Sequence, residues 1–396
     1  MSFLNINVKV DIKLNKYRCY NIDRVIVCLN QYYNISQKRK GGLVLKGLSL
    51  FSGAGIGETY LKQCGIDIIV ANEIIQKRAD LYKKLYPNCN MICGDISKKE
   101  VFDKIVKSAK HVDFLIASPP CQGMSVAGKN RHQNSMLEDK RNYLVQYVFE
   151  IIEQLKPRYI LIENVPALLK FLLPDQGKQK NVIDILKRKF GEYYEIEGKI
   201  VDASDYGVPQ TRLRAIIKMW VKGEKWNWPK KDLHKITVRE AIGNLPSLES
   251  GQKSNIKWHF ARKHSERHIL WMRHTATGMT AFSNKTYYPQ KKDGSRIKGY
   301  ESCYRRIKWD EPAPTITIRS DAISSQRNVH PGRLLEDGTY SDARVLTPYE
   351  LMILTSLPKN WNIPDDTPEI LIRQVIGESI PPLMIKRIVS EIQCLK

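Results

Sequence analysis

Leu48-Ser-Leu-Phe-Ser-Gly-Ala-Gly-Ile-Gly57 is the stretch that decides the fold of this 396-residue chain. It begins as a short apolar strand and breaks into a glycine loop, after which the sequence favours a helix. Glycines let the backbone turn tightly and approach a ligand closely. A strand, a glycine loop and a helix in succession are typical of the first unit of a parallel α/β sheet. An ordinary strand-to-helix turn has the same pattern and stays an alternative.

The same rhythm continues along the next part of the chain. Apolar segments of strand type at 66–70, 112–117 and 159–162 alternate with helical segments at 76–86 and 143–155. Strands that alternate with helices predict an α/β fold in which a doubly wound, mostly parallel sheet is covered on both faces.

The pattern changes after about residue 220. Residues 222–343 lose the alternation and become rich in Gly, Pro, aromatic and basic residues. The helical pattern of the sheet domain resumes at Thr347-Pro-Tyr-Glu350, a capping box with Pro at the first helical position. A final helix is expected through 386–392. We therefore expect a second, smaller irregular domain at 222–343, inserted into a sheet domain made of residues 47–221 and 344–396.

The strongly basic composition predicts a polyanionic partner. The chain has 64 Lys plus Arg against 41 Asp plus Glu, a formal net charge of +23. Residues 1–46 form a basic N-terminal arm with nine Lys or Arg and two Asp, and residues 250–310 hold 14 Lys or Arg against four acidic residues. Nucleic acid is the first candidate for such a partner. A Lys-rich proteome bias, and a merely solvated arm, remain alternatives.

Cysteine and histidine usage argues against a metal site. The eight cysteines are scattered without any CxxC pair, so structural zinc is not expected. Four histidines between 259 and 274 have no cysteine or carboxylate partner in the pattern, so we expect no metal cofactor. Because no signal layout and no apolar run of about 18 residues is present, we expect a cytoplasmic protein with reduced thiols and no membrane contact.

An acidic residue follows the glycine loop at the spacing of a ribose-binding site. Glu73 lies 20 positions beyond Gly53, at the end of the second predicted strand. The loop is Gly-x-Gly-x-Gly and lacks the Lys-Ser/Thr of a phosphate-gripping loop, so a ligand with ribose but no pyrophosphate, such as S-adenosylmethionine, fits better. Asp95, after a third short strand, could accept a hydrogen bond from an adenine amino group or simply form a turn.

Two chemically active side chains follow neighbouring strands. Cys121, in Ser118-Pro-Pro-Cys-Gln122, comes directly after a strand, where the prolines aim it and a thiolate is an accessible nucleophile. Glu163 ends the next strand and faces the same crevice, where burial would raise its pKa and let it donate a proton near neutral pH. A buried, inert cysteine and a salt-bridged glutamate are the alternatives.

Two arginines begin a further apolar strand. Arg212 and Arg214 are two residues apart and should point to one face of that strand. Together they could bind a base carbonyl, a phosphate or the thiolate, whereas solvated charge at a sheet edge is the alternative.

Taken together, these motifs resemble the cytosine-5 DNA methyltransferase family of bacterial restriction-modification type. The resemblance spans about residues 47–220 and 305–395. It is carried, in order, by Phe51-Ser-Gly-Ala-Gly55, Asn72-Glu73, Gly94-Asp-Ile96, Pro119-Pro-Cys-Gln122, Glu163-Asn-Val165, Gln210-x-Arg212-x-Arg214, Arg344-x-Leu-Thr-x-x-Glu350 and Gly377-Glu-Ser-Ile-Pro-Pro382. The set Pro-Pro-Cys-Gln, Glu-Asn-Val and Gln-x-Arg-x-Arg in this order is highly specific.

The resemblance implies a role for each catalytic side chain. Cys121 would attack carbon 6 of a cytosine flipped out of the duplex, and Glu163 would protonate or hydrogen-bond ring nitrogen 3. Arg214 would hold the base oxygen, and Arg212 would support the thiolate and a nearby phosphate. Carbon 5 would then take the methyl group from S-adenosylmethionine, after which a base removes the carbon 5 proton and Cys121 leaves.

The resemblance also implies the cofactor pocket of a Rossmann-like, S-adenosylmethionine-dependent methyltransferase. Its lining residues would be Phe51, Ser52, Gly53, Gly55, Glu73, Asp95, Ile96, Pro120 and Leu144. The sequence departs from the family at Glu378, where the family has Asn, and at Ile74, where an aromatic residue often flanks the adenine. The first departure puts one pocket contact in doubt, and both could tune cofactor affinity.

The basic region 222–343 would be the target-recognition domain of a monomer that binds a specific site in double-stranded DNA. Its Lys and Arg would give salt-dependent phosphate affinity, and Arg296, Arg305 and Arg306 are candidate base readers. A tRNA cytosine-5 methyltransferase and a catalytically idle DNA-binding regulator on the same scaffold are the competing interpretations. Met124-Ser125 and the large basic insert favour DNA over tRNA, and the intact Cys121 argues against an idle protein.

Overall fold

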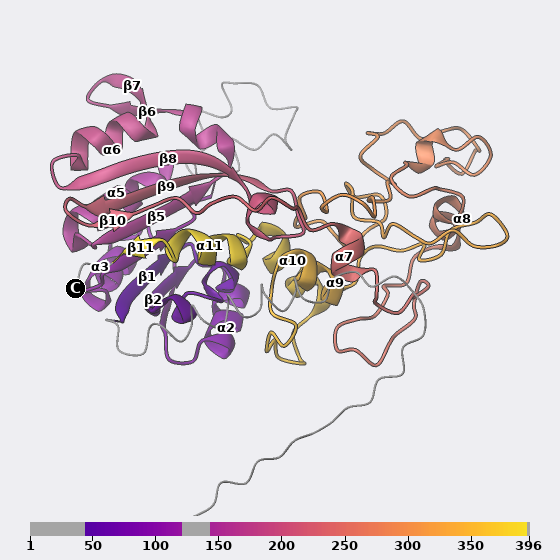
Figure 1. Ribbon diagram of the computed structural model, residues 1–396, viewed down its shortest axis with the longest axis horizontal. Helices are drawn as coiled ribbons and strands as arrows, with labels where there is room; N and C mark the ends of the chain where they lie inside the picture. The colour runs from indigo at the N-terminus through magenta and orange to yellow at the C-terminus, as the bar shows by residue number, and fades with distance from the viewer. Residues whose placement is uncertain (1–43, 121–142, 394–396) are drawn as a thin grey trace, which may run out of the picture. The chain divides into compact units, whose positions relative to one another are not determined.

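The computed structural model of the chain describes residues 44–120 and 143–393, which belong to one compact unit. It contains a seven-stranded sheet with the strand order β3-β2-β1-β4-β5-β9-β8 (Figure 1). Its strands are β1 (Leu45–Leu50), β2 (Ile66–Glu73), β3 (Asn90–Cys93), β4 (Phe114–Ala117), β5 (Tyr159–Asn164), β8 (Tyr194–Asp202) and β9 (Leu213–Val221). Strands β1 to β5 pair in parallel, whereas β9 runs antiparallel to both β5 and β8, so the predicted mostly parallel α/β sheet is confirmed.

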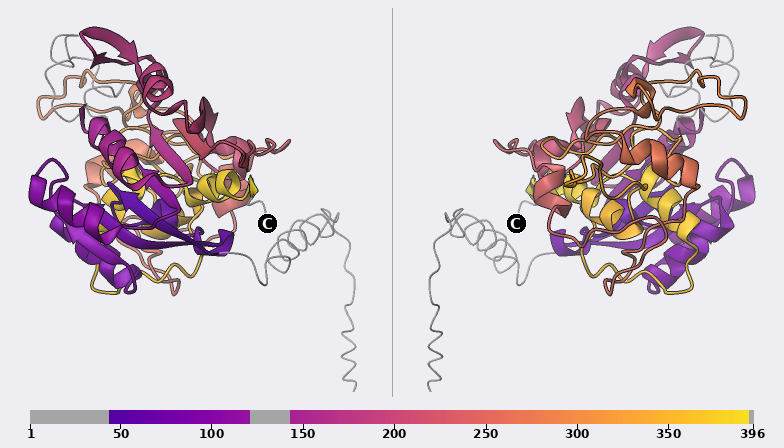
Figure 2. Two further views of the ribbon diagram at one scale, coloured as in Figure 1. Left: turned by 90° about the vertical axis from the view of Figure 1, so that its left-hand side faces the viewer. Right: turned by 90° about the vertical axis from the view of Figure 1, so that its right-hand side faces the viewer.

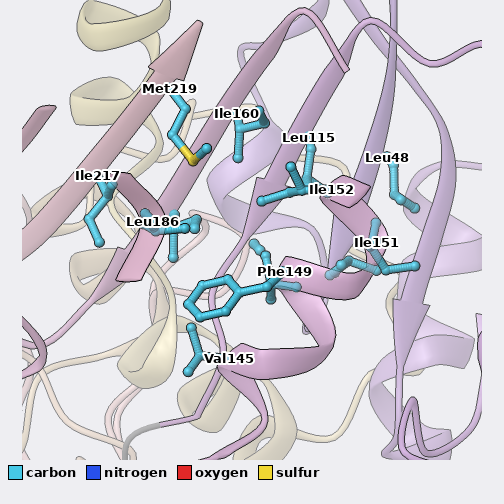
Figure 3. Close-up of a cluster of buried hydrophobic side chains, with 14 of the residues drawn as sticks. Leu48, Leu115, Val145, Phe149, Ile151, Ile152, Ile160, Leu186, Ile217 and Met219 are labelled. Atoms are coloured by element: carbon cyan, nitrogen blue, oxygen red, sulfur yellow. The ribbon is translucent and has the colours of Figure 1, made fainter. Parts of the chain in front are cut away.

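Alternate residues of the central strands enter two different cores, one on each face of the sheet. Leu115 and Ala117 of β4 pack into the first core, and Phe114 and Ile116 pack into the second. Helices α3 (Lys99–Ser108), α5 (Val145–Leu155) and α6 (Val182–Phe190) cover the first face, as Figure 3 shows for α5. Because each strand is apolar on both sides, it reads in the sequence as a continuous apolar run rather than an alternating one.

The second face is covered by the end of the chain. Helix α11 (Pro382–Val389) packs onto it, and β11 (Ile392–Gln393) pairs antiparallel with β10 (Lys225–Trp226). The side views in Figure 2 show the yellow C-terminal helices beside the indigo first strands. The segments 222–226 and 382–393 therefore close the sheet domain, although about 150 residues separate them in the sequence.

Residues between β10 and α9 have little regular structure. They contain α7 (Val238–Ile242), α8 (Glu266–Arg273) and isolated bridges, with a small core of their own around Trp271 and Tyr304. Helices α9 (Pro348–Leu354) and α10 (Glu369–Glu378) follow. Helix α2 (Gln76–Leu85) and the hairpin β6–β7 (Leu172–Asp175, Lys178–Asn181) complete the α-helices and strands of the described residues. No helix within the described ranges combines the length and apolar character that crossing a bilayer requires.

Most predicted elements are present; one was wrong in kind and another in its bounds. The capping box is confirmed: Thr347 and Glu350 bond each other's backbone N–H groups, with Pro348 at the first helical position. The helix expected after the glycine loop is instead a pair of 3-10 turns, Ile56–Glu58 and Lys62–Cys64. The final helix ends at Val389, seven residues from the end of the chain, because the segment after it extends to pair with β10.

Candidate active site

The strand ends that carry the predicted site residues meet at one edge of the sheet. In the strand registers, Leu50 of β1 pairs with Asn72 of β2 and with Ala117 of β4, and Ala117 in turn pairs with Ile162 of β5. The residues that follow these positions are Phe51, Glu73, Ser118 and Glu163, so they lie in a row. The carboxyl edge of a parallel sheet is where α/β proteins bind their ligands.

The glycine loop is held against the end of β2. Phe51, Gly53 and Gly55 have φ of 57°, 56° and 73°, a left-handed backbone that glycine adopts without strain. The backbone N–H of Gly53 donates to Oε2 of Glu73 at 2.9 Å, while the N–H and the hydroxyl of Ser52 both donate to the carbonyl of Asn72. The loop and the acidic strand end therefore form one unit.

The space around the glycine loop differs on its two sides. A Cβ atom added to Gly55 would lie 2.4 Å from the ring of Tyr86, so the loop rests directly on α2. A Cβ atom added to Gly53 would meet no described atom within 4 Å, which leaves room beside the loop. The carboxylate of Glu73 bonds the backbone of this loop, so the residues present, an acidic strand end and a glycine with room beside it, fit a ribose-bearing ligand such as S-adenosylmethionine.

The other predicted pocket residues surround the same loop. Asn72 fixes the end of β3 by donating to the carbonyls of Ile92 and Gly94. Asp95, just beyond, accepts a hydrogen bond from the backbone N–H of Ser97 at 2.9 Å, and Ile96 is buried. Leu144 is the residue before α5 and packs on the first core, and Pro120 is the last described residue before the gap.

Glu163 is a buried carboxylate at the end of β5. It is 7% exposed, and its Oε1 lies 2.7 Å from Nε of Arg214 on the adjacent strand β9. Burial raises the pKa of Glu163 above its ordinary value, although the charges of Arg214 and Arg212 oppose the rise. A carboxyl group whose pKa is raised in this way is suited to donate a proton to a ligand at the strand end.

The residue after Glu163 connects β5 to the predicted nucleophile segment. The side-chain amide of Asn164 donates to the carbonyl of Pro119 at 2.9 Å, and the hydroxyl of Ser118 donates to the carbonyl of Phe51 at 3.1 Å. The segment that leads to Cys121 is therefore fixed on both sides, to the acidic strand end and to the glycine loop. Cys121 itself lies outside the described residues.

Arg212 and Arg214 have different surroundings. Arg214 pairs with Glu163, whereas Arg212 is 2% exposed and donates to the carbonyls of Ile316 at 2.8 Å and Gly377 at 3.1 Å. Gln210 adds two more contacts of this kind, accepting from the backbone N–H of Ile316 and donating to the carbonyl of Leu354. The Gln-x-Arg motif thus holds together segments that lie more than 100 residues apart, a function that the sequence pattern did not suggest.

A second acidic residue lies near the cofactor side of this edge. Glu378, the last residue of α10, pairs through Oε2 with Nη2 of Arg78 on α2 at 2.6 Å. Burial raises the pKa of Glu378 to about 7; Arg78 opposes this rise and the negative charge of Glu73 adds to it. The sequence analysis identified Glu378 as a departure from the family. It did not identify Arg78 as a site residue, because the partner of Arg78 is 300 residues away in the sequence.

One of the predicted base readers was wrong. Arg306 has no exposed surface and donates to the carbonyls of Met272, His330, Asp342 and Tyr340, so it cannot reach a base. Guanidinium groups of Arg296 and Arg305 also donate to backbone carbonyls, at Phe282 and Asn284 and at Glu301 and Gly278 respectively. These contacts hold the irregular region together in place of regular secondary structure.

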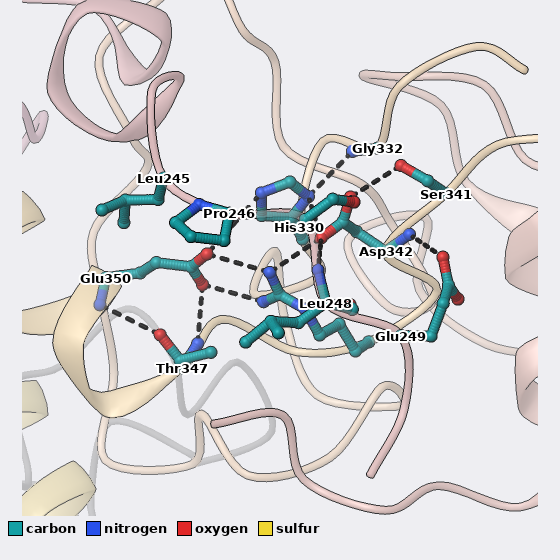
Figure 4. A network of polar contacts seen from close by, with 12 residues as sticks. Leu245, Pro246, Leu248, Glu249, His330, Gly332, Ser341, Asp342, Thr347 and Glu350 are labelled. Atoms are coloured by element: carbon teal, nitrogen blue, oxygen red, sulfur yellow. Dashed lines mark hydrogen bonds and ion pairs between the residues drawn. The ribbon is translucent and has the colours of Figure 1, made fainter. Parts of the chain in front are cut away.

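A buried ionic network joins this region to α9 (Figure 4). The fully buried guanidinium of Arg344 bonds Asp342 at 2.9 Å and both oxygens of Glu350 at 2.8 and 3.0 Å. Burial opposes ionisation of Glu350, but Arg344 and His330 outweigh it and lower its pKa to about 2. His259 is one of the four histidines between 259 and 274 that we did not expect to bind a metal, and its ring forms a hydrogen bond with the hydroxyl of Thr347. The described ranges contain no group of three or more His, Cys, Asp or Glu that could hold a metal ion.

Comparisons with known proteins show the family of the chain. The family described as C-5 cytosine-specific DNA methylase matches residues 45–394. Type II methyltransferase M1.HgaI of Avibacterium volantium is 62% identical over 350 residues, which cover 88% of this chain and 98% of that protein. Type II methyltransferase M1.HphI of Haemophilus parahaemolyticus is 27% identical, with 87% and 86% covered. A solved structure described as a DNA modification methyltransferase encoded within an E. coli prophage has a TM-score of 0.63 at 20% identity and covers 88% of this chain and 98% of its own, which shows a shared fold.

The sheet, the glycine loop with its acidic partner and the buried glutamate at the next strand end define an α/β methyltransferase. The chain belongs to the C-5 cytosine-specific DNA methylase family, because the family match extends over nearly all of the described residues. It is therefore a DNA cytosine-5 methyltransferase, and membership of this family implies S-adenosylmethionine as the methyl donor.

Proposed function

We propose that this enzyme methylates carbon 5 of a cytosine flipped out of a specific double-stranded DNA site, with Cys121 as the nucleophile. The observation that carries the proposal is the environment of Glu163. A buried carboxyl group with a raised pKa, next in the chain to the amide that fixes Pro119, would be suited to meet ring nitrogen 3 of a base attacked by Cys121. A proton or hydrogen bond supplied there would accept the electrons displaced from the ring when the thiolate adds to carbon 6.

Arg214 then has two tasks at the same edge. Its Nε neutralises Glu163, and its remaining guanidinium donors can hold the oxygen on carbon 2 of the base. Arg212 is a positioning residue in this proposal: it donates to the carbonyls of Ile316 and Gly377, and its charge opposes the rise in the pKa of Glu163. This differs from the phosphate contact that the family resemblance suggested for Arg212.

The cofactor pocket is proposed around the glycine loop. Glu73 would accept hydrogen bonds from the ribose hydroxyls, the loop at Gly53 and Gly55 would allow close approach, and Asp95 would accept from the adenine amino group. When bound, S-adenosylmethionine supplies an electrophilic methyl group on a sulfonium. Phe51, Ser52, Ile96, Pro120 and Leu144 would complete the lining.

We infer that residues 222–343 act as the target-recognition domain of a monomeric enzyme. This region has its own small core, its backbone carbonyls accept from several arginine side chains, and it is strongly basic. Exposed Lys and Arg on such a surface attract the DNA backbone and make binding salt-dependent. The relative M1.HgaI is named a Type II methyltransferase, which supports a role in protecting DNA within a restriction-modification system.

Methylation of defined substrates tests the proposed function. The full chain is incubated with S-adenosylmethionine and either duplex DNA or tRNA, and 5-methylcytosine is mapped by sequencing. We expect methylation of duplex DNA at one recurring sequence, loss of turnover in Cys121→Ser with DNA binding retained, and a covalent adduct with duplex that carries 5-fluorocytosine at the target. Labelling of tRNA alone, or substantial turnover by the serine variant, would contradict the proposal.

A further inference from the structure

A buried acidic residue beneath the glycine loop has no part in the proposed mechanism. Glu58 ends the 3-10 turn Ile56–Glu58, which begins directly after Gly55, and its residue is 6% exposed. The side chains that act on its pKa are two hydroxyl groups, and no lysine, arginine or histidine of the described ranges is among them. A buried carboxyl group without a cationic partner is costly to ionise, so its presence here invites a functional explanation.

The carboxyl group of Glu58 connects three elements around the loop. The hydroxyl of Ser49, on β1, donates to Oε1 of Glu58 at 2.5 Å, and the hydroxyl of Tyr82, on α2, donates to Oε2. The third element is the 3-10 turn that carries Glu58 itself. The position of Tyr82 relative to the loop is therefore fixed through this one carboxyl group.

Tyr82 and Tyr86 form the surface on which the glycine loop rests, and we call this pair the tyrosine floor. Their ring centroids lie 4.8 Å apart, and a Cβ atom added to Gly55 would lie 2.4 Å from the ring of Tyr86 and 2.8 Å from that of Tyr82. The hydroxyl of Tyr86 also donates to the carbonyl of Gly55 at 2.7 Å. With contacts this close, a displacement of the tyrosine floor would move the loop.

The surroundings of Glu58 favour its neutral form. Burial raises the pKa of Glu58 to about 7, because the hydroxyls of Ser49 and Tyr82 only partly offset the cost of burying its charge. Burial raises the pKa of Tyr82, Tyr86 and Cys89 as well, so these titratable neighbours stay neutral and supply no countercharge. An ionised Glu58 would therefore need water, which could reach it only if the packing around the tyrosine floor opened.

We propose that Glu58 is a positioning residue for the methyl donor, which in its neutral form keeps the tyrosine floor in place beneath the glycine loop. Ionisation of Glu58 would displace the floor, and the loop would lose the shape that admits the donor. The donor should therefore bind more weakly as pH rises through neutrality. This inference rests on the proposed function, since it assumes that S-adenosylmethionine binds around the glycine loop.

The pH dependence of ligand binding tests the role of the neutral acid. Affinity of the full-length protein for S-adenosylhomocysteine is measured by titration calorimetry from about pH 6 to about pH 8.5, with Glu58→Gln as the variant. Glutamine keeps the shape and hydrogen-bonding capacity of the neutral acid but cannot ionise. We expect affinities within about twofold of each other at the lower pH. At the upper pH the variant should bind up to about 30-fold more tightly than the unmodified protein, the limit for one group that titrates near 7.

The ratio of the two affinities at each pH is the quantity that decides. Burial raises the pKa of Glu378 to about 7 as well, so this residue titrates in the same range. Its contribution is common to both proteins and cancels in the ratio, as does any titration of the ligand. A ratio that stays within about twofold over the whole range would overturn the inference.

Tyr86→Phe tests the contact between the tyrosine floor and the loop. It keeps the ring below Gly55 and removes only the hydroxyl that donates to the carbonyl, so binding of S-adenosylhomocysteine should weaken about fivefold. Tyr194→Phe is the matched control, because Tyr194 lies on β8 at the edge of the sheet and its buried hydroxyl donates to the carbonyl of Pro157 at 2.9 Å. Unchanged affinity in Tyr86→Phe, or an equal loss in Tyr194→Phe, would also overturn the inference. If the unmodified protein does not bind S-adenosylhomocysteine at any pH in the range, the proposed function itself fails.

Discussion

Glu163→Gln is the substitution that tests the proposed chemistry most directly. Glutamine has nearly the same shape, and its amide oxygen can still accept from Nε of Arg214, which lies 2.7 Å from the carboxylate in the structure. The site should therefore keep its geometry. What the variant loses is the proton that a carboxyl group can pass to ring nitrogen 3, together with the negative charge that neutralises Arg214.

The expected loss of rate follows from the role of Glu163 as an acid. General acid catalysis by a positioned side chain contributes about 10²- to 10⁴-fold, so the single-turnover rate of methyl transfer should fall by about that factor. Affinity for S-adenosylhomocysteine should be unchanged, because Glu163 is not among the residues that bond the glycine loop. The midpoint of thermal unfolding should fall only slightly, since the hydrogen bond to Arg214 can be retained.

The pH dependence gives a second, independent readout. Burial raises the pKa of Glu163, so its proton-donating form persists to a higher pH than for an exposed glutamate. The rate of the unmodified enzyme should fall as pH rises through that pKa, and this descending limb should be absent in Glu163→Gln. Asp175→Asn is the control: Asp175 also pairs with an arginine, Arg188 at 2.5 Å, but lies on β6. A glutamine variant that reacts within tenfold of the unmodified enzyme, with the same descending limb, would refute the assignment.

Three other changes test the cofactor loop, the ionic network and the basic region. Gly55→Ala should abolish binding of S-adenosylhomocysteine in calorimetry, because the added Cβ would lie 2.4 Å from a tyrosine ring at a φ of 73°; retained affinity would contradict this reading of the loop. Glu350→Gln should reduce the free energy of unfolding in urea by about 3 kcal/mol at pH 7, since it leaves the fully buried Arg344 with less countercharge. Because the pKa of Glu350 is lowered to about 2, that difference should persist down to about pH 4.5 and shrink as pH falls toward 2; a difference that grows on acidification would argue against it. Replacing both Lys291 and Lys292 with Gln should lower the slope of log affinity for DNA against log salt by about two, and an unchanged slope would exclude both from the phosphate contacts.

The sequence predicted the sheet and its ligand edge because those features depend on local patterns. Apolar runs, the glycine loop and the position of Glu73 and Glu163 at strand ends are all set within a few residues. The register of parallel strands then brings those ends together without further information. The strands predicted at 66–70, 112–117 and 159–162 were correct to within three residues at either end, and the acidic strand ends needed no correction, whereas β8 was not predicted.

The contacts that the sequence did not reveal are long-range and involve arginine. Arg306 looked like a base reader because it lies in a basic, aromatic region, yet it is buried against carbonyls from segments at 272, 330, 340 and 342. Arginine is equally suited to bases, phosphates and converging carbonyls. Only the three-dimensional convergence of those carbonyls decides between them, and a sequence pattern contains no record of it.

Arg212 depends on both a local sequence motif and long-range contacts with distant segments. The Gln-x-Arg-x-Arg motif puts it two residues before Arg214, the partner of Glu163, and its charge opposes the rise that burial causes in the pKa of Glu163. Its location, however, is fixed by the carbonyls of Ile316 and Gly377, which belong to the irregular region and to α10. A movement of either segment would shift a positive charge relative to the proton donor. Gly377 immediately precedes Glu378, which pairs with Arg78. The guanidinium of Arg212 therefore connects three parts of the site: Glu163, the segment around Ile316, and the Arg78–Glu378 pair. These three parts cannot rearrange independently.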